Sequence, residues 1–118
     1  MSTLAFIKKK LPESEAATLV KRILQMILSE IEPRAIFLFG SAARNELTDQ
    51  SDIDLLIVMP SDTAIKSARK KIAKIRQQFG VPVDLVWMTT EEYQRRISIG
   101  GLAQVVHEEG VLISGGIE

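Results

Sequence analysis

Residues 39–58 read FGSAARNELTDQSDIDLLIV, in which a polar segment with a Gly-Ser pair separates two apolar runs. The first run is AIFLF at residues 35–39, and the second is DIDLLIV at residues 52–58. A third run, VPVDLVW, follows at residues 81–87. Continuous apolar runs of this length are typical of strands buried on both faces of a sheet. The sequence therefore predicts three buried strands.

The segment between the second and third strands, residues 61–79, has the pattern of an amphipathic helix. Ser61 is suited to cap its N-terminus, and Gly80 is suited to cap its C-terminus. A strand–helix–strand unit favours a parallel crossover between its two strands.

Helices and one more strand are predicted on both sides of this unit. We expect a helix over residues 13–31, a short helix opened by the capping pair Thr89 and Glu92, a second short helix near 102–108, and an edge strand at 110–114. Together the elements predict a single α/β domain over residues 1–118, with a mixed sheet of about four strands and flanking helices.

The composition excludes several classes of protein. The chain has 118 residues, no cysteine and 46% hydrophobic residues, which excludes a disulfide scaffold and an intrinsically disordered chain. No apolar run approaches the roughly 20 residues that span a bilayer, so we expect a cytoplasmic protein without membrane contact. The 15 basic and 15 acidic residues cancel, which argues against a strongly electrostatic nucleic-acid binder.

Three aspartates lie within the otherwise apolar second and third runs. Asp52 and Asp54 are two residues apart, so they should point to the same side of one strand, roughly 6.6 Å apart. Asp84 can join them if the third strand lies beside the second. A divalent cation such as Mg²⁺ would offset the repulsion between these carboxylates, which suggests a two-metal phosphoryl-transfer site. Taken singly, each aspartate could instead serve a turn or a backbone hydrogen bond.

Gly40 and Ser41 directly follow a predicted buried strand and precede AARNEL, which can start a short helix. Glycine lets a phosphate approach the backbone, and a serine hydroxyl with free amides at a helix N-terminus can bind an anion. A Gly-Ser pair also ends strands in proteins that bind no phosphate. The chain contains neither G-x-x-x-x-G-K-[ST] nor G-x-G-x-x-G, so P-loop and dinucleotide-binding classes lack support.

Gly40-Ser41, ten intervening residues and Asp52-x-Asp54 closely resemble the signature of the DNA polymerase β-like nucleotidyltransferase superfamily, in particular its minimal members. The resemblance implies that Gly40 and Ser41 hold the outer phosphates of a nucleotide. It also implies that Asp52 and Asp54 hold two metal ions. Asp84 would complete the metal site and help to activate the incoming hydroxyl group.

The resemblance covers about residues 34–113. Many relatives have G-S-R-A-R-G at the phosphate turn, whereas this chain keeps Arg44 and has Ala42 and Asn45 at the flanking positions. Arg44 is expected to neutralise charge on the triphosphate, and its alternative role is that of a surface cation.

The resemblance further implies transfer of AMP from ATP to a hydroxyl group, with two Mg²⁺ ions as cofactors. Larger relatives carry a second domain that binds the acceptor, so we expect the acceptor of this short chain to lie on another molecule. Stand-alone members of this size resemble antitoxins that are paired with HEPN-type RNase toxins, and some transfer AMP to a tyrosine of the toxin. We therefore expect a protein adenylyltransferase that forms a hetero-oligomer with such a toxin.

Two other functions stay open: a nucleotide-binding module that neutralises a partner by contact, and a transferase that acts on RNA or a small molecule. The central helix bears on this choice, because residues 66–76 hold six cations and no acid: Lys66, Arg69, Lys70, Lys71, Lys74 and Arg76. With no aromatic residue among them, a solvated face is favoured over a polyanion-binding face. An acidic partner protein is a further alternative.

Overall fold

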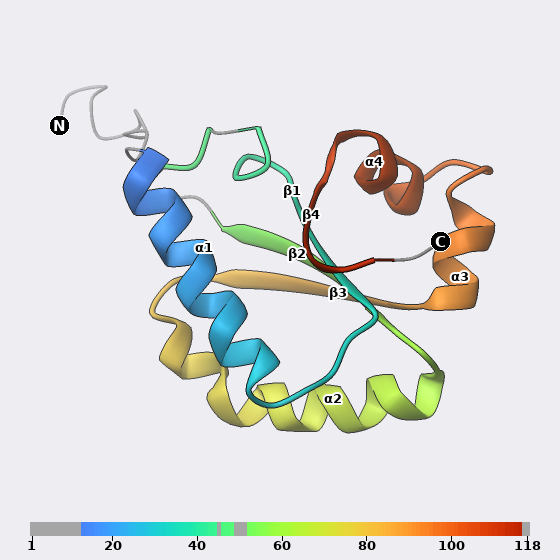
Figure 1. The fold of residues 1–118 in the computed structure, drawn as a ribbon, viewed down its shortest axis with the longest axis horizontal. Helices are drawn as coiled ribbons and strands as arrows, with labels where there is room; N and C mark the ends of the chain where they lie inside the picture. The colour runs from blue at the N-terminus through green and yellow to red at the C-terminus, as the bar shows by residue number, and fades with distance from the viewer. Residues whose placement is uncertain (1–12, 45, 49–51, 117–118) are drawn as a thin grey trace, which may run out of the picture.

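The computed structural model describes residues 13–44, 46–48 and 52–116 (Figure 1). The elements follow one another as α1 Glu13–Leu28, β1 Ala35–Phe39, β2 Ile53–Met59, α2 Asp62–Ile75, the 3-10 turn η2 Arg76–Phe79, β3 Val83–Thr89, α3 Thr90–Arg96, α4 Leu102–Glu109 and β4 Val111–Gly115. The four predicted strands and the two short helices expected after Thr89 and near residues 102–108 are present, with ends displaced by one or two residues. No helix in this part of the chain is long and apolar enough to cross a membrane.

The four strands form one mixed sheet in the order β3-β2-β1-β4. β1 is antiparallel to both β2 and β4, whereas β2 and β3 are parallel and are joined by the α2 crossover. This arrangement confirms the predicted α/β class, the mixed four-stranded sheet and the edge position of the last strand.

One prediction about the sheet is wrong. β3 is not buried on both faces, because it forms the second edge of the sheet, and both Asp84 and the middle of the strand are partly open to solvent. Its apolar residues are explained by contacts on the two faces, since Val83 packs in one core cluster and Met88 in the other. The free edge leaves the strand accessible between these contacts.

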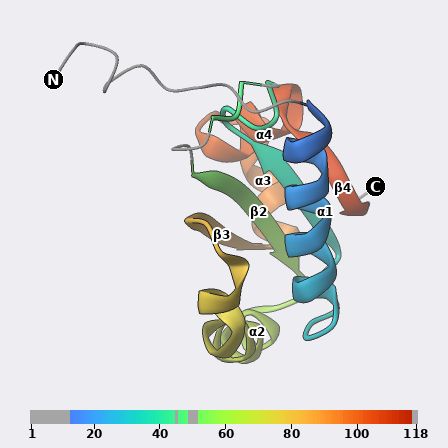
Figure 2. The same ribbon diagram turned by 90° about the vertical axis from the view of Figure 1, so that its left-hand side faces the viewer.

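The sheet separates two apolar clusters. Figure 1 shows α1 and α2 on one side of the sheet and α3 and α4 on the other, and Figure 2 shows the same layers from the side. Side chains alternate along a strand, so Leu55 and Ile57 of β2 pack with α1 and α2, while Leu56 and Val58 pack with α3 and α4. Asp54 points to the same side of β2 as Leu56 and Val58, which is the face covered by α3 and α4.

The ends of α2 follow the predicted capping chemistry. The Ala64 amide donates to Ser61 Oγ over 3.1 Å, and Gly80 ends η2 with a left-handed φ of 80°. The predicted helix over residues 61–79 tightens into a 3-10 turn over its last four residues. The predicted helix over residues 13–31 ends at Leu28, and the residues that follow form a turn.

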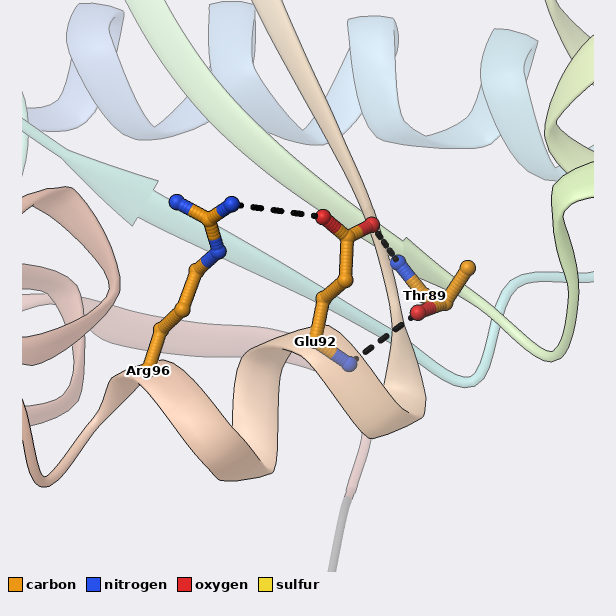
Figure 3. Close-up of polar contacts among 3 residues, drawn as sticks. All are labelled: Thr89, Glu92 and Arg96. Atoms are coloured by element: carbon orange, nitrogen blue, oxygen red, sulfur yellow. Dashed lines mark hydrogen bonds and ion pairs between the residues drawn. The ribbon is translucent and has the colours of Figure 1, made fainter.

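The capping pair of α3 is also present. The Glu92 amide donates to Thr89 Oγ1 over 3.0 Å, and the Thr89 amide donates to Glu92 Oε1 over 3.2 Å (Figure 3). Arg96 approaches the other carboxylate oxygen of Glu92 at 3.7 Å. The capping pair fixes the point where β3 gives way to α3.

Candidate functional site

Asp54 and Asp84 lie opposite each other on the paired strands β2 and β3. Asp54 is half-buried near the start of β2, and Asp84 is exposed on the edge strand. Burial raises the pKa of the Asp54 carboxyl above its usual value, and the neighbouring charges of Asp84 and Asp52 raise it further. Arg44 acts in the opposite direction and lowers this pKa. The pair is therefore a partly desolvated group of like charges.

Asp52 lies one residue before β2, which was expected to begin at residue 52, and it is exposed. Its charge nevertheless contributes to the raised pKa of Asp54.

Gly40 approaches the carboxylate of Asp54 closely. β1 pairs with β2 so that Phe39 lies opposite Asp54, and Gly40 follows with a φ of +72°. A Cβ atom at residue 40 would collide with Oδ2 of Asp54 and would lie 3.3 Å from its Cγ. The backbone conformation at residue 40 thus favours glycine, and any larger residue there would also have to displace the Asp54 carboxylate.

The segment after Gly40 forms a turn rather than the predicted short helix. The Arg44 amide donates to the Gly40 carbonyl over 3.3 Å, and the Glu46 amide donates to the Ser41 carbonyl over 2.8 Å. Leu47 then enters the core cluster on the side of α1 and α2, which draws the chain away from a helical path. Asn45 lies outside the described residues. Ser41 therefore lies in the turn at the end of β1, directly after Gly40, which approaches Asp54.

Arg44 forms an exposed ion pair that the sequence analysis did not consider. Its Nε donates to Glu46 Oε1 over 2.7 Å, and this bond and the charge of Glu46 raise the pKa of Arg44. Glu109 and Asp54 also act on Arg44 through their charges. Glu46 could have been suspected from its place two residues after Arg44. Glu109 lies at the end of α4, and no local pattern connects it with the turn.

The donor chemistry of the cluster suits a hard divalent cation. Such a cation prefers carboxylate oxygens, and it would relieve the charge repulsion that raises the pKa of Asp54. Asp52, Asp54 and Asp84 are the residues that could hold it. Among the described residues, however, no three acidic or histidine side chains are already grouped closely enough to hold one ion. Joint binding therefore requires at least one side chain to move.

The chain is similar to known proteins over most of its length. Residues 20–113 match a family model described as a nucleotidyltransferase domain. Over 79 residues, which are 67% of this chain and 77% of the relative, it is 32% identical to a Methanocaldococcus jannaschii protein named “Putative protein adenylyltransferase”.

Two crystal structures share the fold. A “putative nucleotidyltransferase” from Sulfolobus solfataricus superposes with a TM-score of 0.53 at 21% identity, and the match covers 85% of this chain and 80% of the other. A structure described as a “toxin-antitoxin with AMP-PNP” superposes with a TM-score of 0.50 at 23% identity, and the match covers 90% of this chain and 75% of the other.

Proposed function

This chain belongs to the nucleotidyltransferase family, and on that premise we propose that it transfers AMP from ATP to a hydroxyl group of a partner protein. The observation that carries the proposal is the pairing of Asp54 with Asp84 directly beside the Gly40-Ser41 turn. A turn that could take phosphate oxygens, close to a carboxylate pair, suits phosphoryl transfer, since catalysis there depends on positioning and on charge. The name of the relative from Methanocaldococcus jannaschii supports a protein acceptor.

The proposed reaction exchanges the α,β-phosphoanhydride bond of ATP for a phosphate ester bond to the acceptor. The oxygen of the acceptor hydroxyl forms a bond to the α-phosphorus of ATP, the bond from that phosphorus to the bridging oxygen of the β-phosphate breaks, and pyrophosphate leaves. The hydroxyl proton passes to a carboxylate, for which Asp84 is the candidate because it is exposed on the edge strand.

The remaining site residues bind and orient the nucleotide. Gly40 and Ser41 are proposed to hold the outer phosphates. Arg44 would leave its ion pair with Glu46, pair with a phosphate instead and so neutralise part of the phosphate charge. Two Mg²⁺ ions, held by Asp52, Asp54 and Asp84, would supply the positive charge that the triphosphate and the leaving pyrophosphate require.

The proposed acceptor is a HEPN-type toxin, with which the chain would form a hetero-oligomer. A structural neighbour described as a toxin–antitoxin with AMP-PNP supports a partner protein and a bound adenine nucleotide. The expected tyrosine acceptor has a hydroxyl group that can approach an open site at the edge of the sheet.

A labelling experiment tests the proposal. The purified chain is incubated with ATP labelled on the α-phosphate, with Mg²⁺, and with a HEPN-type toxin or an extract of the source cell. We expect label on a protein band, and we expect it to disappear when Mg²⁺ is omitted or in the Asp84→Asn variant. Asp62→Asn is the matched control, because Asp62 is an exposed aspartate at the start of α2. Label on RNA or on a small molecule, with none on protein, would contradict the proposed acceptor.

A second candidate is a nucleotide-binding module that neutralises its partner by contact alone. The absence of a ready-made group of three metal-binding carboxylates among the described residues favours this candidate. The double variant Asp54→Asn/Asp84→Asn distinguishes the two functions. If it protects the partner as well as the unchanged chain does, contact is sufficient; if protection is lost while partner binding persists, transfer is the function.

A further inference from the structure

The outer side of α2 carries a row of cations that faces solvent. Lys66, Lys70 and Lys74 are each exposed and follow one another at intervals of four residues. This spacing places them in a line along the helix, about 6 Å apart. Arg69 and Lys71 flank the row on its two sides and are also exposed. These five residues are called the basic row below.

The basic row carries more positive charge than the single aspartate of its own helix can balance. In the part of the chain that the structure describes, none of the five forms an ion pair within 4.0 Å. The only acidic residue of α2 is Asp62 in its first turn, where the charge interacts favourably with the helix N-terminus. The row therefore presents positive charge to whatever approaches this side of the molecule.

A pocket lined by both apolar and polar residues opens beside the basic row. It has a volume of about 380 Å³ and lies between α2 and the connection that follows α1. Its apolar lining consists of Leu28, Ile31, Met59, Pro60, Ala64 and Ala68. Ser67 and Lys71 of α2 border the pocket, so it adjoins the basic row. Leu28 is 40% exposed, which is unusual for a large apolar side chain in a helix that faces a core.

We propose that the basic row and this pocket form one docking surface for an acidic helical segment of a partner protein. Carboxylates repeated at every fourth residue of such a segment would lie opposite Lys66, Lys70 and Lys74. A leucine-sized side chain on the neighbouring face of the segment would enter the pocket. The surface thus selects both a charge pattern and an apolar anchor.

The same features favour a protein over a nucleic acid. A phosphate backbone offers charge but no aliphatic side chain to contact the apolar residues of the pocket. Glu30 and Glu32 also border the pocket, so a polyanion that extends past the basic row would meet negative charge. A helical segment can keep its acidic face on α2 and its apolar face in the pocket.

The docking surface lies apart from the carboxylate pair. Asp54 is near the start of β2, whereas Met59, which lines the pocket, ends the same strand, about 17 Å away at five residue rises. Asp54 also faces α3 and α4, while α2 covers the opposite face of the sheet (Figure 1). A partner bound to α2 would therefore leave the nucleotide site open.

The test uses a fluorescently labelled synthetic helix that has glutamate at every fourth position and leucines on the adjacent face. Its binding to the full chain is measured by fluorescence anisotropy without nucleotide, so that failure of docking is separate from failure of transfer. A second peptide with glutamine at the same positions is the comparison. We expect the glutamate peptide to bind about tenfold more tightly, because three exposed charge pairs each contribute a fraction of a kcal/mol.

Charge reversal then locates the site. Lys70→Glu should weaken binding of the glutamate peptide by about fivefold, because it replaces one attraction with a repulsion, and Ser67→Phe, which blocks the pocket, should weaken both peptides. Arg95→Glu on α3 makes the same charge change at another exposed helix position and should have no effect. Circular dichroism of each variant verifies that it is folded.

Three outcomes would overturn the proposal: equal binding of the two peptides, equal effects of Lys70→Glu and Arg95→Glu, or binding of a single-stranded RNA probe at α2 while the acidic peptide does not bind.

Discussion

The carboxylate groups of Asp54 and Asp84 come from directly opposed positions of a parallel strand pair. Opposed residues of neighbouring strands point to the same face and are roughly 4.8 Å apart at the backbone. Their charges therefore repel each other in a place that burial already makes unfavourable for the charged form of Asp54. The arrangement reduces stability in the absence of a cation, and this cost is measurable.

The first prediction concerns pH. The pKa of Asp54 is higher in the folded protein than in the unfolded chain, so the folded protein binds this proton more tightly. The free energy of unfolding therefore falls as pH rises from the unfolded pKa through the folded pKa. Asp54→Asn removes that penalty. Without divalent metal, its Tm should exceed that of the unchanged chain at neutral pH, and the difference should vanish near about pH 3, below both pKa values.

Thermal unfolding followed by circular dichroism measures this difference. Asp62→Asn serves as the control and should lower Tm slightly at neutral pH, because it removes a negative charge from the first turn of α2. A Tm of Asp54→Asn that is equal to or below that of the unchanged chain at neutral pH would contradict the prediction.

The second prediction concerns metal binding. If the cluster of Asp52, Asp54 and Asp84 holds Mg²⁺, saturating Mg²⁺ should raise the Tm of the unchanged chain, since a ligand of the folded state stabilises it by mass action. At a hundred times the dissociation constant the gain is about 2.7 kcal/mol. Asp54→Asn should lose most of this increase in Tm. At saturating Mg²⁺ the unchanged chain should therefore have the higher Tm, the reverse of the order without metal. The same Mg²⁺ response in both proteins would show that the ion binds elsewhere.

The third prediction concerns Gly40. Gly40→Ala must hold an alanine at a left-handed φ, which costs about 1–2 kcal/mol, and must also displace the Asp54 carboxylate. Gly80→Ala isolates the first effect, because Gly80 is left-handed with a φ of +80° and an added Cβ there would meet only the Arg22 side chain at 3.5 Å, an ordinary van der Waals contact. We expect Gly40→Ala to be the more destabilising of the two in urea unfolding.

A double-mutant cycle separates the collision from the backbone effect. In an Asp54→Ala background the carboxylate is absent. There, Gly40→Ala should lower the free energy of unfolding by about 1 kcal/mol less than it does in the unchanged chain. Additive effects of the two substitutions would mean that the two residues are not in contact.

The fourth prediction concerns the capping pair of α3. Thr89→Ala removes the oxygen that accepts from the Glu92 amide, and such a loss costs about 1 kcal/mol. Thr89→Ser keeps that oxygen and should recover most of the stability. Chemical denaturation measures both variants, and equal losses in the two would assign the effect to the methyl group of Thr89 rather than to the hydrogen bond.

The sequence was most informative where a local pattern carries the structure. The α2 crossover, with Ser61 and Gly80 at its two ends, was predictable from helical spacing and capping chemistry. Once β2 and β3 are parallel neighbours, the proximity of Asp54 and Asp84 follows from their places in the two runs.

The sequence was less informative where contacts between distant segments determine the position of a strand or the path of a turn. The run VPVDLVW is apolar enough for an interior strand, and only the strand order places it at an edge. The turn after Gly40 leads to Leu47, whose place in the core depends on distant elements that the local sequence does not reveal. The contact between Gly40 and Asp54 depends on the antiparallel register of β1 and β2, which no short motif encodes.

The edge position of β3 has a consequence for how the site is maintained. Within the sheet, β3 is held by β2 alone, and local opening of an edge strand costs less free energy than global unfolding. Each such opening carries Asp84 away from Asp54 while β1 and β2 stay paired. Occupancy of the site and closure of β3 are therefore thermodynamically linked, so a ligand that bridges the two carboxylates also slows hydrogen exchange along this strand.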